Sequence, residues 1–370
     1  MLAKQLLAMV AMLAFAGSVL AHKASDSFLY VDMDASEVRI DIALRDLALL
    51  VPLDSNGDQK VTGQELRAQR NLATQAIESA ITLTNEQGAC NIRGQAWGLS
   101  AHSDGPYLAT RYRVDCPNGK LPDQIEYTLL FDRDSLHRGL VQITSGETRS
   151  LTVLSPDQPV VDLTGGAIGP WSTFGTFLYE GVVHLLIGLD HMLFLLVLVL
   201  PATLITRRQK DQGADRSLKS RLLQLTGIVT AFTLAHSITL ALSALDIVRL
   251  PIAWVETVIA LSIAAAALNV AWPFLGRKTW KLAFAFGLVH GFGFASVLGD
   301  LTGGVSNLAV ALAGFNLGVE FGQLGLLIVG FPLLYALAHV KAYQRIVVPL
   351  VLMGVGIVSL MWVVERAGSI

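Results

Sequence analysis

The sequence has few charged residues and few cysteines for its length. Only 15% of its 370 residues are Asp, Glu, Lys or Arg, whereas 53% are hydrophobic, and the mean hydropathy is +0.54. This composition excludes an ordinary pair of soluble domains, so part of the chain must lie in lipid. The net charge of −2 is not the basic charge expected of a protein that binds nucleic acid. Neither a P-loop nor a dinucleotide-binding glycine pattern occurs, which argues against direct use of ATP.

The first residues combine a lysine, an apolar stretch and small residues that end at Ala21. This arrangement is typical of a signal peptide, residues 1–21, and an uncleaved membrane helix is the alternative. Cleavage would make His22 the first residue, whose amine and imidazole could chelate a metal; a residue that merely follows the cleavage site is the plainer interpretation. Behind such a signal, Cys90 and Cys116 are expected to form a disulfide, and two unpaired thiols are the alternative.

Residues 22–164 are polar and mixed, and their short alternating runs predict strands separated by turns. We expect a β-rich extracytoplasmic domain with a helix–loop–helix insertion near residues 44–83. The loop, residues 54–65, resembles an EF-hand because oxygen donors recur at the ligand positions, although Gln59 replaces the usual glycine. A metal-free polar loop is the alternative. The residues expected to bind calcium are Asp54, Asn56, Asp58, Lys60 through its carbonyl, Thr62 and Glu65.

After a hinge at residues 165–174, long apolar runs predict an all-α, six-helix transmembrane bundle within residues 175–364, followed by a short tail, residues 365–370. The loops after the first, third and fifth spans are rich in Lys and Arg, which places them in the cytoplasm. The sequence thus predicts a multi-pass protein of the bacterial cytoplasmic (inner) membrane, with its N-terminal domain in the periplasm or otherwise outside. The predicted spans are residues 175–200, 223–246, 252–275, 280–299, 308–338 and 345–364.

Ionisable side chains inside these spans are costly in lipid, so they normally face the bundle interior and mark a pathway or a site. Imidazole with carboxylate suits Zn²⁺, Ni²⁺, Co²⁺ or Fe²⁺. The candidate metal ligands are His184, Asp190, His191, His236, His290 and Glu320. Other polar residues expected to line the interior are Glu180, Glu256, Asn316 and Gln323.

Glu180, His184 and His191 are expected to share one stripe of the first helix, and Asp190 is rotated away from this stripe, which suits a partner of a ligand. Glycines beside the histidines, Gly188 and Gly291 among them, would let helices approach closely. For any single histidine, a hydrogen bond to a neighbouring Ser or Thr is the alternative. Two histidines of the N-terminal domain, His102 and His137, are expected to be ordinary surface residues.

The run His184-Leu-Leu-Ile-Gly188-Leu-Asp190-His191 resembles the His-x-x-x-Gly-x-Asp-His signature of the HupE/UreJ family. Members are membrane proteins associated with hydrogenase and urease maturation and are regarded as nickel permeases. The run His290-Gly-Phe-Gly-Phe294 and the start at His22 are similar to a longer branch that adds an extracytoplasmic N-terminal domain. The resemblance implies that His184, Asp190 and His191 handle metal and that metalloenzyme maturation proteins are partners.

Together these features predict a permease for a divalent transition metal, nickel or cobalt first, rather than an enzyme. Its partners would be the lipid bilayer and the ion, with calcium in the outer domain. An intramembrane zinc-dependent hydrolase of a lipid amide or ester is a second hypothesis, with Glu180 or Asp190 as general base. A metal-binding accessory or sensor protein is a third. Tightly bound, stoichiometric metal would favour either rival, and a lipid product would indicate the hydrolase.

Overall fold

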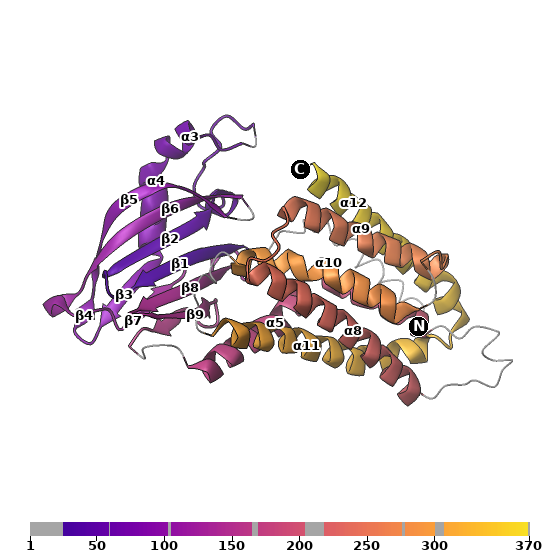
Figure 1. Ribbon diagram of the computed structural model, residues 1–370. Helices are drawn as coiled ribbons and strands as arrows, with labels where there is room; N and C mark the ends of the chain where they lie inside the picture. Colours follow the sequence, from indigo (N-terminus) through magenta and orange to yellow (C-terminus); the bar gives the residue numbers. More distant parts are fainter. Residues whose placement is uncertain are drawn as a thin grey trace. The chain divides into compact units, whose positions relative to one another are not determined.

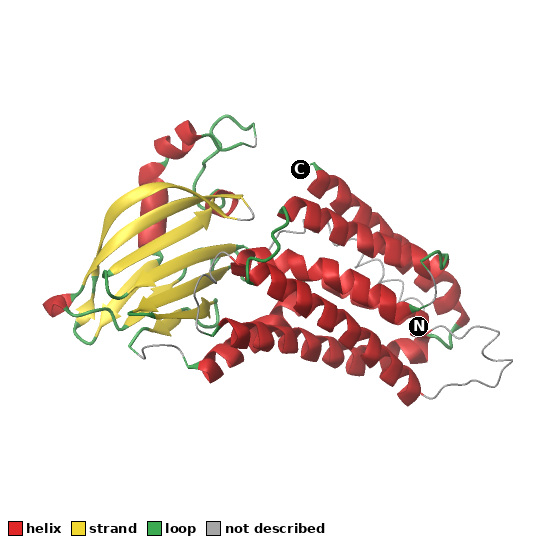
Figure 2. Cartoon of the chain, viewed as in Figure 1, coloured by secondary structure: helices red, strands yellow, loops and turns green. Residues whose placement is uncertain are grey.

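The computed structural model describes residues 25–58, 60–102, 105–164, 169–203, 218–275, 278–299 and 307–368. The chain separates into two compact units, one built mainly from residues 22–176 and the other from residues 177–299 and 311–370. The first unit is β-rich and the second is helical (Figures 1 and 2), which confirms the predicted change of fold class along the chain. The predicted signal peptide, His22, Gln59 and most of the loop after the first span lie outside the described residues.

The described residues of the β-rich unit form two sheets. The larger sheet has the strand order β5-β6-β2-β1-β8-β9, in which β1 and β8 are parallel and the other neighbours antiparallel (Figure 1). Its strands are β1 (Asp26–Asp32), β2 (Glu37–Ala43), β5 (Asn91–His102), β6 (Gly105–Asp115), β8 (Arg138–Ser145) and β9 (Thr148–Leu154). The smaller, antiparallel sheet has the order β10-β7-β3-β4, with strands β3 (Ile81–Asn85), β4 (Gly88–Ala89), β7 (Gln124–Tyr127) and β10 (Val160–Asp162).

Alternation of side chains along each strand builds the core of this unit. Val38, Ile40 and Ile42 of β2 are buried in the core, because residues two apart point to the same face of a strand. A disulfide joins Cys90, just before β5, to Cys116, just after β6. The predicted disulfide is therefore present, and it closes the base of the β5–β6 hairpin.

The predicted EF-hand-like insertion contains α2 (Leu44–Leu47), α3 (Gly63–Ala68) and α4 (Arg70–Ser79). The helix before the loop is a single turn, shorter than the EF-hand pattern implies. The Glu65 carboxylate accepts hydrogen bonds from the backbone and hydroxyl of Thr62 at 2.9 and 2.7 Å, and from those of Ser55 at 3.0 and 2.8 Å. These bonds, those from Thr62 first, lower the pKa of Glu65 to about 2. Glu65 thus caps α3 as half of a capping box, and calcium binding stays a prediction.

Among the described residues, four helical segments are each long and apolar enough to cross a membrane, namely α8, α9, α11 and Tyr343–Ala367, which contains α12. The pair α5 and α6, bent by 72°, makes a fifth if it forms one span. Helix α10 coincides with the predicted fourth span, and the count of six spans stays a prediction. The helices are α5 (Pro170–Ile187), α6 (Leu189–Thr203), α8 (Leu218–Ala244), α9 (Ile252–Ala271), α10 (Thr279–Gly299), α11 (Leu308–Leu337) and α12 (Val348–Ala367).

Glycine allows α5 and α11 to pack backbone to backbone. A Cβ on Gly181 would lie 2.1 Å from the carbonyl oxygen of Phe315, and one on Gly318 would lie 2.1 Å from that of Leu178. Any larger residue would therefore push the helices apart.

Candidate functional site

The signature run lies at a break between α5 and α6. Gly188 occupies the break, where a Cβ would lie 2.9 Å from the carbonyl oxygen of His184 and 3.0 Å from Nδ1 of His191. The prediction that Glu180, His184 and His191 share a stripe on one continuous helix is therefore wrong. The bend nevertheless brings His184 and His191 together, with ring centroids 5.0 Å apart. Broken helices are tolerated in membranes where they are buried in protein or line a cavity.

Asp190 holds the imidazole of His191 in one orientation. Its Oδ1 accepts the backbone N–H of His191 at 2.8 Å and lies 2.9 Å from the ring Nδ1. A carboxylate only accepts, so Nδ1 carries a proton, and in the neutral ring Nε2 keeps its lone pair. His191 is 6% exposed, and Nε2 has no hydrogen-bond partner among the described residues. Asp190 thus acts through His191, as a partner of a metal ligand would.

His290 on α10 is fixed in the same way. Its Nδ1 lies 2.9 Å from the carbonyl oxygen of Phe286, an acceptor that also requires the ring proton on Nδ1. The buried Nε2 of His290 has no partner in the part of the chain that the structure describes. Its ring centroid lies 5.3 Å from that of His191. Two fixed imidazoles therefore stand beside each other in the bundle with open lone pairs.

His236 on α8 reaches the same cluster because α8 and α10 are in close contact. A Cβ on Gly291 would lie 2.1 Å from Oγ1 of Thr239 and 2.3 Å from the carbonyl oxygen of His236. The ring of His236 is fully buried, 6.1 Å from that of His191, and neither ring nitrogen has a partner among the described residues. The hydroxyls of Ser237 and Thr239 donate to backbone carbonyls instead, so neither is the partner of this imidazole.

The four imidazoles form an open arrangement around His191, whose ring contacts the rings of His184, His236 and His290. Aromatic side chains, Phe194 and Phe232 among them, pack around it. Within the described ranges, no three His, Cys, Asp or Glu side chains stand as a ready metal-binding group. The ring of His191 is thus the member of the cluster that contacts the other three imidazoles.

A second polar feature, the α8–α11 seam, joins α8 to α11. The hydroxyl of Thr230 donates to Glu320 Oε1 at 2.8 Å, and that of Thr233 donates to Gln323 Oε1 at 3.1 Å. Sequence reasoning missed the two threonines, although their spacing of three residues places them on one face of a helix.

The remaining predicted polar residues lie on α11, α5 and α9. Asn316 on α11 donates to the carbonyl oxygen of Leu312 at 2.9 Å. Glu180 lies on α5, one turn before His184, and Glu256 lies on α9, where its backbone oxygen accepts from Arg366 at 3.1 Å.

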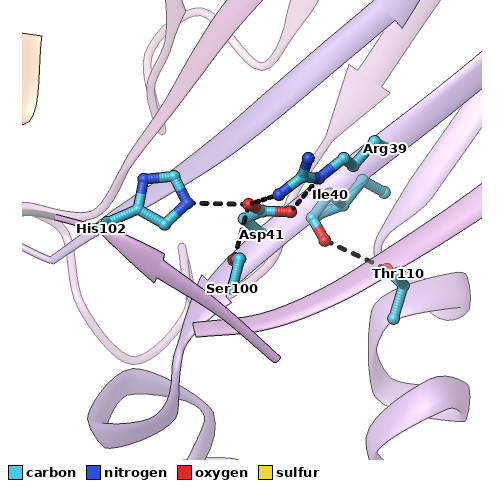
Figure 3. Close-up of polar contacts among 6 residues, drawn as sticks. All are labelled: Arg39, Ile40, Asp41, Ser100, His102 and Thr110. Carbon is cyan, nitrogen blue, oxygen red and sulfur yellow. Dashed lines mark hydrogen bonds and ion pairs between the residues drawn. The ribbon is translucent and has the colours of Figure 1, made fainter. Parts of the chain in front are cut away.

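In the β-rich unit, the expectation that His102 lies on the surface is wrong. Its side chain is 6% exposed, and Nε2 lies 2.7 Å from Oδ2 of the fully buried Asp41 (Figure 3). Arg39 and Ser100 also donate to this carboxylate. Burial alone would raise the pKa of Asp41, but the hydrogen bonds from His102, Arg39 and Ser100 outweigh it and lower that pKa. The His102 ring stacks on Phe28 at 4.3 Å, so the group ties β1, β2 and β5 together.

His137 is also buried, contrary to expectation. Its Nδ1 lies 2.5 Å from the hydroxyl of Ser25, and its Nε2 lies 3.1 Å from that of Ser27 and 2.8 Å from that of Tyr127. Ser25 and Ser27 lie 112 and 110 residues from His137 in sequence, which is why no local pattern signals the group. The imidazole links the start of β1 to β7.

We expect acid to destabilise the β-rich unit through His137. Burial first, then the charges of Arg138 and Arg45, lower its pKa from 6.5 to about 3. Between these two pKa values, His137 is protonated in the unfolded chain but neutral in the folded one. Its contribution to the free energy of unfolding is therefore fully present above the usual pKa and is lost as the pH falls toward about 3. From about pH 7 to about pH 5 the loss is about 2 kcal/mol. Hydrogen exchange of β1 and β8 peptides, corrected for the intrinsic pH dependence of exchange, measures this loss of stability. An equal loss in His137→Gln would show that His137 is not the group responsible.

The fold and the cluster define a class of protein: a multi-pass membrane protein with histidines buried between its helices. Residues 163–366 match the family described as HupE / UreJ protein. This match covers more than half of the chain and includes the whole imidazole cluster, so the chain belongs to the HupE/UreJ family, which is of transporter type and generally related to nickel and cobalt transport. No curated protein matches the chain.

Proposed function

We propose that this protein is a permease for a divalent transition-metal ion, nickel or cobalt first, and that the buried imidazoles are its transient ligands. The observation that carries the proposal is the pair His191 and His290. Each is fixed with its proton on Nδ1, and each leaves a buried Nε2 without a partner among the described residues. A buried polar atom left unpaired costs about 1–3 kcal/mol, a cost that a bound cation would remove.

The donor chemistry supports a transition metal over a hard cation. Ca²⁺ and Mg²⁺ take oxygen ligands, whereas neutral imidazole nitrogen suits Zn²⁺, Cu²⁺, Fe²⁺ and Ni²⁺. The Asp190 carboxylate bonds the ring of His191, a member of the cluster. A divalent ion in this cluster would therefore meet imidazole nitrogen, with the negative charge of Asp190 behind His191.

The openness of the cluster favours passage over storage. A structural metal site presents a closed set of ligands, whereas the described residues hold no ready group of three. A transported ion needs weak, neighbouring pairs of ligands, because it must dissociate from each binding site as readily as it binds there. The ligands bind metal only when deprotonated, so loading would be favoured by neutral pH.

The remaining parts of the proposal concern the outer domain and the orientation. Residues 22–164 would lie in the periplasm, and the short basic loops between spans support this placement. Calcium at residues 54–65 would stiffen the loop, and the low pKa of Glu65 keeps its carboxylate charged for that task. Metalloenzyme maturation proteins would receive the ion.

Uptake of Ni²⁺, Co²⁺ and Zn²⁺ into proteoliposomes bearing the full chain tests the proposal. We expect saturable uptake of nickel or cobalt that falls by roughly tenfold or more in His290→Ala, because a ligand is lost. The matched control is His339→Ala, since His339 makes the same Nδ1 contact to a carbonyl four residues back but is exposed. Uptake no greater than that of empty liposomes would contradict the permease, and retained stoichiometric zinc would then direct attention to lipid substrates.

A further inference from the structure

We propose that His191 is a hub shared by two successive metal stations, one formed with His184 and the other with His290. The inference rests on the proposed function and adds how the ion would move. An ion bound between His184 and His191 would pass to the second station by exchanging one imidazole for another while His191 stays bound. It would thus never be without a protein ligand inside the apolar bundle, where an isolated charge is very costly.

The distances between rings carry the argument. Two imidazoles that bind one tetrahedral Zn²⁺ at about 2.0–2.1 Å hold their ring centroids roughly 5 Å apart. The pairs His184–His191 and His191–His290 are at 5.0 and 5.3 Å, so each is spaced to share an ion. His236 is farther from His191, at 6.1 Å. The spacing therefore gives two pairs that share one ring, His184 with His191 and His191 with His290.

The architecture explains why His191 is the shared member. The break at Gly188 separates its helix from that of His184, so the two imidazoles belong to different helical segments. Asp190 fixes the ring of His191 through Nδ1. Nε2 of His191 would therefore be available to bind an ion that is shared first with His184 and then with His290. His290 comes from α10, which packs through Gly291 against the helix of His236. His236 would therefore assist the second station.

Binding measurements on the full chain in nanodiscs test the hub separately from transport. With Ni²⁺ alone as the probe, we expect His184→Ala and His290→Ala each to keep one bound ion, with Kd raised by no more than about tenfold, because one station survives in each. His191→Ala removes both stations and should raise Kd by about a hundredfold or more. Uptake should be lost in all three variants. His191→Gln is a second variant, since the glutamine amide can still donate to Asp190.

Equal loss of binding in all three alanine variants would overturn the hub and indicate a single site. Unchanged binding in both His191→Ala and His191→Gln would also overturn it. Thermal melts of each variant identify any that fails to fold, and the glutamine variant then decides. If the Kd values of wild type and variants follow the expected pattern but the wild-type protein takes up no metal, the permease is contradicted and the hub is supported. If it takes up metal and all variants bind alike, the permease survives and the hub fails.

Discussion

Replacing Gly291 by alanine is expected to abolish most metal uptake although no ligand is removed. The added Cβ would lie 2.1 Å from Thr239 Oγ1 and 2.3 Å from the carbonyl oxygen of His236, and a backbone atom cannot move aside as a side chain can. Overpacking of this kind costs about 1–3 kcal/mol. The helices α8 and α10 must separate, which carries His236 and His290 apart. Proteoliposome uptake of Ni²⁺ measures the loss, and we expect roughly tenfold or more.

Gly227→Ala provides the matched control for this substitution. Gly227 lies on α8, the helix that packs against Gly291 of α10, and a Cβ there would meet nothing within 4 Å. We expect its uptake and its melting temperature to equal those of the wild type or to rise slightly, since alanine favours helix over glycine by about 1 kcal/mol. Equal loss in both variants would show that any helical glycine is sensitive and would contradict the role of close packing at Gly291.

Replacing Asp190 by asparagine should weaken nickel binding by about 10–100-fold, the usual effect of removing a group that orients a metal ligand. Asparagine keeps the shape of the side chain but loses its charge. It therefore no longer compels His191 to hold its proton on Nδ1, and no negative charge remains beside the ion. Isothermal titration of the full chain with Ni²⁺ measures the change in Kd.

The control for Asp190→Asn is Asp246→Asn. Asp246 is an exposed carboxylate in the turn after α8, where it pairs with Arg249. An exposed pair contributes about 0–1 kcal/mol, so this variant should bind nickel as the wild type does. Unchanged affinity in Asp190→Asn, or an equal decrease in both variants, would show that the Asp190–His191 bond does not prepare the ligand.

The residue types of the candidate site can be predicted from the sequence, because an ionisable group is costly in lipid and is therefore rare in a membrane span. His184, His191, His236 and His290 could be singled out one by one in long apolar runs. Their arrangement could not, since the helical wheel assumes one continuous helix and the chain breaks at Gly188. A glycine between two histidines permits a break but does not require one, and only the packing of the neighbouring helices decides it.

The β-rich unit shows the same limit for another reason. Alternating runs predicted strands, and Cys90 and Cys116 predicted their own pairing. The burial of His102 and His137 depends on partners such as Asp41 and Ser25, which lie about 60 to 110 residues away in sequence. No local pattern reveals such a pairing, because a polar residue at a strand end has the same surroundings in sequence whether it is buried or exposed.

X-ray absorption at the nickel edge, on the full chain loaded with one equivalent of Ni²⁺ in nanodiscs, tests the central claim most directly. The account predicts a first shell containing imidazole nitrogen, with the outer-shell scattering of the ring, and predicts that this signal is lost in His191→Ala. A shell of oxygen alone, unchanged in that variant, would contradict the account, since it would place the ion away from the buried histidines, for example at the acidic loop of residues 54–65.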